Sequence, residues 1–181
     1  DLSWTAMPIT LRNGKVTTHH LNGSCLIFTA AGGHVGTVDF QGRRPVLGIS
    51  HGGHPSLRSP KQTLQVETRL LPPDVKYLFF TLSAFAPGGV TMAVFQNPSV
   101  HLRDAATRTT LSSYTDNQRN SEAVVLCYAS KDLYGQWRVS QVGVSSSGNK
   151  SDYSPLVQTI QDLAWNSEFL PSRQLRVSVE Q

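Results

Sequence analysis

The sequence has little cysteine, little charge and no long apolar run. Its only thiols, Cys25 and Cys127, each lie within an apolar segment, so we expect two buried, reduced side chains rather than a disulfide framework. Charged residues make up 15% of the 181-residue chain, below the ~25% typical of soluble domains. The longest apolar runs fall far short of the ~20 residues that cross a bilayer, so the sequence predicts no transmembrane helix.

Acidic residues are also scarce. The 12 Asp and Glu against 16 Lys and Arg give a net charge of +4, and the basic residues are scattered. The only local concentrations are Arg43 with Arg44 and Arg58 with Lys61, which fall short of the basic stripe of a nucleic-acid-binding protein. We therefore predict no nucleic-acid partner and at most weak membrane association. These four positions are the candidate contacts for a partner protein or for another domain of the same chain.

The first residues carry no targeting signal. The chain starts with Asp1 and lacks a basic stretch followed by an apolar one, so we expect it to be part of a longer protein. Reduced cysteines are typical of cytoplasmic proteins. We predict a cytoplasmic location, with peripheral membrane contact as the alternative.

Alternation of apolar and polar residues with period two dominates the chain, which is typical of strands. Asn13-Gly14 and Ala31-Gly32-Gly33 each separate two alternating segments and predict hairpins. Residues 76–85 are apolar on both faces and predict a central, buried strand. Apolar residues at helical spacing in 155–163, behind a candidate N-cap at Ser154, predict one helix. Further strands are predicted at 63–70, 90–95, 100–104, 122–130 and 135–144.

These elements predict a mainly β fold, a two-sheet β-sandwich of about ten short strands with one short C-terminal helix. We assign residues 1–163 to the domain. Residues 164–181 are predicted to be a C-terminal extension, either an added strand or a linker, because alternation resumes only at 175–179.

An ordered series of segments resembles the TerD family of tellurite-resistance and stress proteins. The run Asn22-Gly23-Ser24-Cys25 resembles the start of the strand pair that opens the TerD core. The passage Leu71-Pro72-Pro73-Asp74-Val75 resembles a family segment that precedes a hydrophobic strand. Four later segments follow in the family's order: 97–111, 122–126, 136–139 and 142–143. The resemblance as a whole extends over residues 22–163.

The resemblance implies a β-sandwich that binds calcium through acidic loops at one end. Ca²⁺ requires six to eight oxygen ligands, several of them carboxylates. Where the family has two aspartates, this sequence has His20 and Asn22, and His51, His54 and Lys61 lie in the segments that are acidic in the family. We therefore expect calcium binding to be lost and no cofactor to be bound.

Histidines at the same end leave a second interpretation open. Imidazoles suit zinc, nickel or copper, and His19, His20, His51 and His54 would meet there if the resemblance holds. No cysteine or carboxylate lies nearby in sequence to complete such a site, so histidines bonded to backbone or water are favoured. A metal-responsive or membrane-peripheral sensor is thus the alternative function.

Catalytic motifs are missing from the sequence. Ser, His and Asp occur, but no Gly-x-Ser-x-Gly turn does, and neither cysteine begins a helix. Asp104, Asp116 and Asp132 lie in or beside turns, where Asp ordinarily accepts hydrogen bonds from nearby amides. We predict a non-catalytic binding or scaffold domain of a stress-response-type protein.

Overall fold

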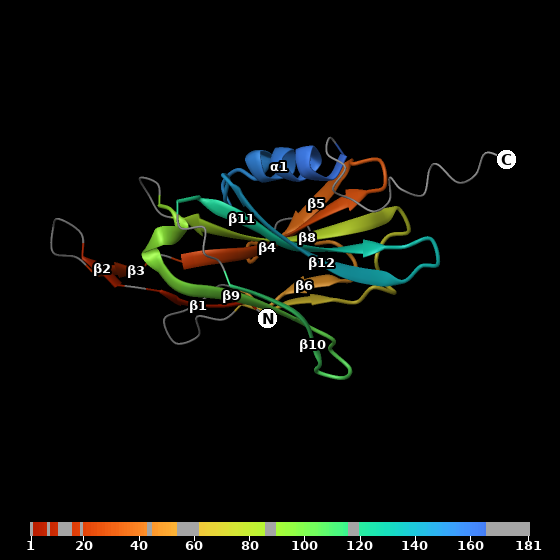
Figure 1. Cartoon of the computed structure of the whole chain (residues 1–181), viewed down its shortest axis with the longest axis horizontal. Coiled ribbons are helices and arrows are strands. Elements are labelled where there is room, and N and C mark those ends of the chain that lie inside the picture. Colours follow the sequence, from red (N-terminus) through yellow and green to blue (C-terminus); the bar gives the residue numbers. More distant parts are fainter. Residues whose placement is uncertain are drawn as a thin grey trace.

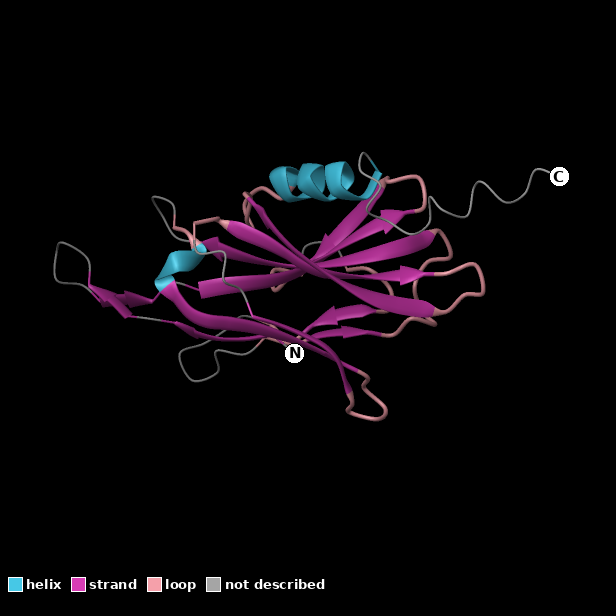
Figure 2. Ribbon diagram, in the orientation of Figure 1, coloured by secondary structure: helices cyan, strands magenta, loops and turns pink. Residues whose placement is uncertain are grey.

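The computed structural model describes residues 2–6, 8–10, 16–18, 20–42, 45–53, 62–85, 90–115 and 120–165. These residues form three layers, with helix α1 above a five-stranded sheet and the remaining longer strands below it (Figures 1 and 2). No helix among them is long and apolar enough to cross a membrane. The elements are β1 (Leu2–Ala6), β2 (Pro8–Thr10), β3 (Val16–Thr18), β4 (His20–Thr29), β5 (His34–Val38), β6 (Ile49–His51), β7 (Leu64–Val66), β8 (Val75–Phe85), the 3-10 helix η1 (Met92–Val94), β9 (Phe95–Arg103), β10 (Thr110–Thr115), β11 (Ala123–Lys131), β12 (Trp137–Ser146) and α1 (Ser154–Trp165).

The five-stranded sheet is antiparallel, with the order β12-β11-β8-β4-β5. Strand β8 occupies its centre, as predicted from an apolar pattern on both faces, and pairs with β4 and β11. The hairpin of β4 and β5 around Gly32 is confirmed, as is the hairpin of β2 and β3.

The second layer contains the sheet β1-β9-β10 and the pair β6-β7. Between the layers lies one hydrophobic core, to which the central sheet contributes Ile27, Leu78 and Leu126 and the second layer contributes Ile49 and Val100. For the part of the chain that the structure describes, this arrangement confirms the mainly β fold with one C-terminal α-helix.

Helix α1 covers the other face of the five-stranded sheet. Leu156 and Ile160 are fully buried there against a second core that includes Phe79 and Tyr128. Ser154 is the first helical residue, because the Tyr153 carbonyl accepts the first backbone bond, from the Val157 amide at 2.9 Å, so the prediction of Ser154 as N-cap was wrong. The Asp152 Oδ1 atom accepts a hydrogen bond from the Ser154 amide at 2.9 Å and thus satisfies the first amide of the helix.

The C-terminal end of α1 is tied to the turn between β4 and β5. The Trp165 indole N–H donates to the Ala30 carbonyl at 3.1 Å, and its ring lies 5.6 Å from that of Phe28 and 5.4 Å from that of Tyr77. A Cβ on Gly32, whose φ is 87°, would come within 2.9 Å of the Trp165 ring. Only glycine fits this close approach without a shift.

Two predicted elements differ in the structure. Residues 92–94, predicted as strand, form η1, because the Thr91 hydroxyl accepts a hydrogen bond from the Ala93 amide at 3.4 Å. The predicted spacer 96–98 lies inside β9. Pro98 lies where the pairing with β1 shifts register between Ser3 and Thr5, and such an irregularity is a position at which strands tolerate proline.

Tertiary pairing explains the remaining differences. Strands β1, β6 and β10 were not predicted, and β10 consists largely of Ser and Thr whose strand conformation depends on pairing with β9. The strand predicted at 63–70 ends at Val66, where Glu67 and Leu70 form a turn closed by a 3.0 Å bond from the Leu70 amide to the Glu67 carbonyl. Helix α1 extends past the predicted domain end at residue 163, and residues 166–181 lie outside the described residues.

Candidate functional site

Only part of the predicted loop site falls within the described residues. Asn22 and His51 are described in full, and His20 is described as the first residue of β4. The other predicted metal or partner contacts lie outside the described residues: His19, Arg43, Arg44, His54, Arg58 and Lys61.

Asn22 belongs to a buried polar row. It is 2% exposed and lies opposite Ser83 of β8, while the hydroxyls of Ser24 and Thr81 hydrogen-bond at 2.8 Å on the next pair. Because alternate residues share a face of a strand, Asn22 lies on the same face as Phe28, which packs in the core beneath α1.

His51 lies in β6, in the opposite layer. Its Nδ1 accepts a hydrogen bond from the Gly53 amide at 3.0 Å, so the ring proton of the neutral side chain is on Nε2. Burial is the main cause that lowers the pKa of His51, although the backbone of Gly23, then Asp39 and the Gln62 side chain, act in the opposite direction. The ring also makes an edge contact with Phe40, at 6.5 Å between centroids. The Nδ1 lone pair is therefore used within the turn and is not directed toward Asn22.

Gln62 is a residue that the sequence did not single out. It is 2% exposed, and its Oε1 accepts a hydrogen bond from the Gly23 amide at 2.7 Å, which joins β4 to the start of the β7 segment. Its Nε2 and the His51 Nε2 have no hydrogen-bond partner among the described residues. The groups brought together around Gly23 are thus an amide, an imidazole and backbone, and the nearby Asp39 carboxylate is engaged elsewhere.

Acidic residues near this end are used to hold the chain. Asp39 is 7% exposed, and it accepts hydrogen bonds from the Tyr153 hydroxyl and from the Gln41 amide, both at 2.9 Å. Glu122 accepts from the Gly148 amide at 3.0 Å and from the side chain of Asn149. Among the described residues, no three His, Cys, Asp or Glu side chains are grouped so that they would hold a metal ion.

Both thiols are buried in the core, as expected. Burial raises the pKa of Cys127 to about 12 and raises that of Cys25 further, with a smaller contribution from the proximity of Cys127. Neither thiol is ionised at neutral pH, and a nucleophilic cysteine requires the thiolate.

Asp104 and Asp132 anchor turns, as expected. The Oδ1 atom of Asp104 accepts from the Ala106 and Thr107 amides at 2.8 and 2.9 Å. The Oδ1 atom of Asp132 accepts from the Tyr134 and Gln136 amides, both at 2.9 Å. Asp116 lies outside the described residues.

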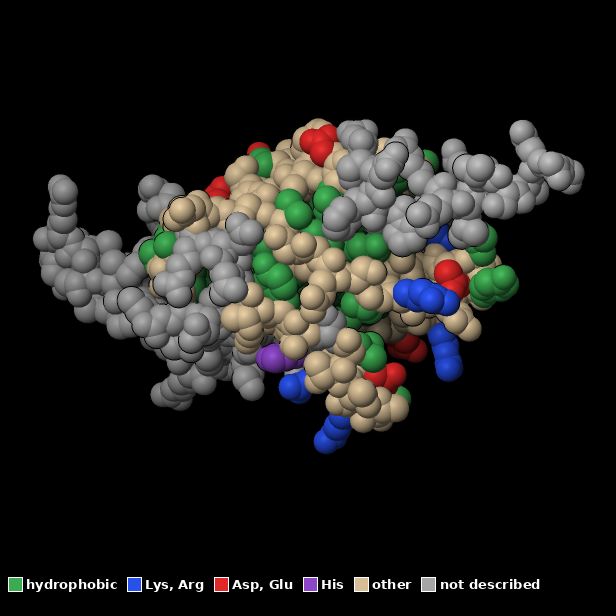
Figure 3. Space-filling model, in the orientation of Figure 1, with side chains coloured by type: hydrophobic (Ala, Val, Ile, Leu, Met, Phe, Trp, Pro, Cys, Tyr) green, Lys and Arg blue, Asp and Glu red, His purple; other side chains and the backbone are tan. Residues whose placement is uncertain are grey.

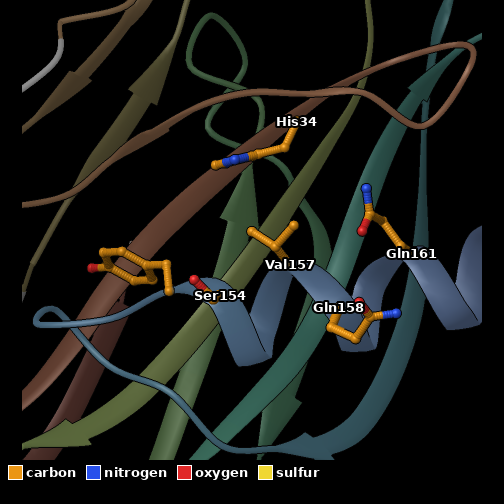
Figure 4. A pocket seen from close by; sticks show the side chains of 6 residues that line it. His34, Ser154, Val157, Gln158 and Gln161 are labelled. Carbon is orange, nitrogen blue, oxygen red and sulfur yellow. The ribbon is translucent and has the colours of Figure 1, made fainter.

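A shallow hollow of about 340 Å³ lies between β5 and α1 (Figure 4). Its polar groups bond within the fold, since the His34 ring lies 3.0 Å from the Thr37 hydroxyl and Gln161 donates to the Gly32 carbonyl at 2.9 Å. The lining combines these groups with one aliphatic side chain and no charged residue: His34, Tyr153, Ser154, Val157, Gln158 and Gln161.

Comparison with known proteins identifies the fold. No protein-family model and no curated protein matches the chain. The crystal structure of a homologue of the telluride resistance protein TerD, from Streptomyces coelicolor A3(2), superposes with a TM-score of 0.70 over 85% of this chain and 92% of that one. The chain has a TerD-like fold.

A second solved structure supports the same conclusion. The unknown-function protein SAV2460 superposes with a TM-score of 0.69, over 86% of this chain and 92% of that chain. Sequence identity is 16% to the TerD homologue and 15% to SAV2460, so the likeness shows a TerD-like fold and carries no binding property with it.

Proposed function

We propose that this TerD-like domain is a non-catalytic binding module of a cytoplasmic, stress-response-type protein and that it has lost calcium binding. The observation that carries the proposal is the use of neutral groups where the resemblance implies a calcium site. Asn22 lies on the α1 side of the sheet, while His51 and Gln62 contact backbone amides on the other side. A hard divalent cation gains too little from such ligands to replace its hydration shell.

The chemistry of the remaining groups supports a non-catalytic role. The thiols are held protonated by burial, and the described carboxylates of Asp39, Asp104, Glu122 and Asp132 accept hydrogen bonds from backbone or neighbouring side chains. A general base or nucleophile needs a group that is available to a substrate, and these groups are used to fix turns. The partner in this proposal is another protein or another domain of the same chain.

Ion titration tests the loss of metal binding. A ligand present at 100 times its dissociation constant adds ~2.7 kcal/mol of stability, which raises the Tm of a domain of this size by roughly 5 to 10 °C. We expect no Tm change when Ca²⁺ or Zn²⁺ is added to the EDTA-treated chain at millimolar concentration. A rise with Ca²⁺ would overturn the proposal. A rise with Zn²⁺ that His51→Gln abolishes would instead establish the histidine sensor.

A binding experiment tests the predicted basic contacts. The chain and a variant with Arg43, Arg44, Arg58 and Lys61 changed to Ser are used as bait under identical conditions. Loss of specific partners in the variant is the expected result. Recovery of the same proteins by both forms would show that these four side chains are not the contact surface.

A further inference from the structure

The tip of the β11–β12 hairpin carries the two most exposed large hydrophobic side chains of the described residues. Leu133 is 77% exposed and Tyr134 is 90% exposed. The hairpin projects from the right-hand end of the molecule in Figure 1, where Figure 3 shows hydrophobic side chains beside Lys and Arg. Single exposed hydrophobic residues are common, whereas an adjacent pair at a projecting tip marks a candidate contact.

The turn that presents this pair is held by a dense set of hydrogen bonds. Besides the two amides bonded to its Oδ1, Asp132 pairs through Oδ2 with Arg138 at 3.3 Å. The Asp132 amide donates to the Gln136 carbonyl at 2.8 Å, and the Asp132 carbonyl accepts a hydrogen bond from Lys76 Nζ at 3.3 Å. A turn that is already ordered loses little conformational freedom when its tip is bound.

The fold itself does not require apolar residues at this tip. The β9–β10 hairpin uses the same device, because Asp104 accepts from the amide two residues ahead, as Asp132 does. The residues that follow Asp104 are Ala105 and Ala106, in the positions that Leu133 and Tyr134 take after Asp132. The bulky apolar pair is therefore a property of one hairpin and not of the turn type.

Positive charge accompanies the pair. Lys76, Lys131 and Arg138 lie on the strands next to the tip, and the ion pair with Asp132 offsets the charge of Arg138. Asp74, in the loop before β8, offsets a second positive charge, so that one of the three remains in excess. A partner surface that complements this tip is apolar where Leu133 and Tyr134 contact it and weakly anionic where the cations lie.

We propose that Leu133 and Tyr134 insert into the interface of a lipid bilayer and that the flanking cations lie at the level of anionic headgroups. A fluid bilayer conforms to a projecting tip, whereas a protein partner would need a matching pocket. Tyr is enriched at membrane interfaces, where its ring is apolar and its hydroxyl stays hydrated, and Leu favours the hydrocarbon boundary. This inference rests on the binding module proposed above and adds a lipid surface to the protein or domain partner proposed there.

Two side chains produce reversible association. A single myristoyl chain gives only marginal membrane binding, with an association constant of ~10⁴ M⁻¹, and one Leu with one Tyr buries less apolar surface than that chain. Each net positive charge near an anionic surface strengthens binding about fivefold. We therefore expect binding at millimolar lipid that increases a few-fold when phosphatidylserine is included.

Vesicle sedimentation tests the proposal on the full 181-residue chain. Phosphatidylcholine vesicles with and without phosphatidylserine are pelleted with the wild type, with Leu133→Ser/Tyr134→Ser, and with the matched control Ala105→Ser/Ala106→Ser. We expect the wild type and the control to bind and the Leu133→Ser/Tyr134→Ser variant to bind at least tenfold more weakly. Equal binding by all three proteins, or no binding by the wild type at millimolar lipid, would overturn the proposal.

Site-specific labelling gives a second readout. Because both native thiols are buried and protonated, Leu133→Cys and Ala106→Cys can each be labelled selectively with an environment-sensitive dye. A blue shift of the dye on vesicles is expected at position 133 and not at position 106. The same shift at both positions would show that the tip is not the point of insertion.

Failure of this proposal is distinguishable from failure of the proposed function. If neither vesicles nor metal ions bind, the lipid contact is overturned while the loss of calcium binding stands, and the exposed pair is then open to a protein partner. If vesicles bind only when Ca²⁺ is present, both proposals are overturned.

Discussion

The β9–β10 and β11–β12 hairpins have the same type of anchor and different tips. Asp104 and Asp132 each accept two amide hydrogen bonds, yet the first turn contains Arg108 at a φ of 58° and the second contains Gly135 at a φ of 80°. The left-handed region is strained for Arg and open to Gly. The aspartate therefore determines the start of each turn, while the rest of the tip is free to vary with function.

A third hairpin, between β4 and β5, is held by α1 instead of an aspartate. Removing the contact between α1 and this hairpin should have the largest effect on stability. Trp165→Ala removes the bond to Ala30 and the contacts with Phe28 and Tyr77. Since Trp165 is only partly buried, we expect a loss of ~2 to 3 kcal/mol, measured by urea unfolding. Gln161→Ala, which removes one bond to Gly32, is the control and should cost ~1 kcal/mol. Equal costs would contradict the role of the indole.

Exchanging the tips sharpens the comparison of the two aspartate hairpins. Ala105→Leu/Ala106→Tyr, introduced together with Leu133→Ser/Tyr134→Ser, moves the apolar pair to the other anchored turn. We expect vesicle binding to be largely restored, because Arg103 and Arg108 give the β9–β10 tip flanking cations of its own. The measurement is sedimentation with phosphatidylserine-containing vesicles. No recovery would show that an anchored, cation-flanked apolar pair is not sufficient for binding.

Substitutions at the left-handed positions should act in opposite directions. Gly135→Ala places a Cβ at a φ of 80° and should destabilise the chain by ~1 kcal/mol through strain, since its nearest neighbour, Lys131 Cε at 3.9 Å, causes no clash. Arg108→Gly relieves strain but increases the freedom of the unfolded chain, so a gain of only ~0.5 kcal/mol is expected. Thermal unfolding of both variants measures these two stability changes. A loss of stability in Arg108→Gly would mean that its side chain makes a contact worth more than the strain.

The smallest effect is expected from acid titration of the two anchors. The pKa of Asp104 is lowered mainly by the Thr107 amide, and that of Asp132 mainly by the Gln136 amide. Each carboxylate therefore contributes stability that is fully present above the ordinary Asp pKa and is lost as pH falls through the lowered value. Asp104→Asn and Asp132→Asn should each flatten the Tm profile in this acidic range. An unchanged profile in both variants would contradict the anchoring role.

Much of the fold was predictable because local patterns and tertiary pairing agree. Strand β8 is largely apolar on both faces, apart from Thr81 and Ser83, and lies at the centre of the sheet; the glycine turn at Gly32 joins β4 and β5. Strand β10 was not predictable, because its Ser and Thr side chains give no apolar alternation and its conformation depends on pairing with β9. The Thr91 hydroxyl, which begins η1, was a local signal that could have been recognised.

The candidate site was less predictable than the fold. The resemblance placed Asn22 and His51 at one end, but the pleat of β4 directs Asn22 to the face beneath α1. Gln62, which joins Gly23 across the layers, had no distinguishing motif because its role depends on a contact 39 residues away in sequence. The exposed pair Leu133 and Tyr134 could have been found from two bulky apolar residues between Asp132 and Gly135, a position where turn residues are normally polar.

The buried hydroxyls of Ser24 and Thr81 have a consequence for assembly of the sheet. They meet on adjacent central strands, with Asn22 and Ser83 forming the next pair along. A slip of β4 by one residue would turn these polar groups into the apolar interior between the layers and would bring Cys25 and Ile27 to the side of α1. A misaligned pairing of β4 and β8 would therefore bury unpaired polar groups and cost free energy, so the polar row favours the native register of these two strands.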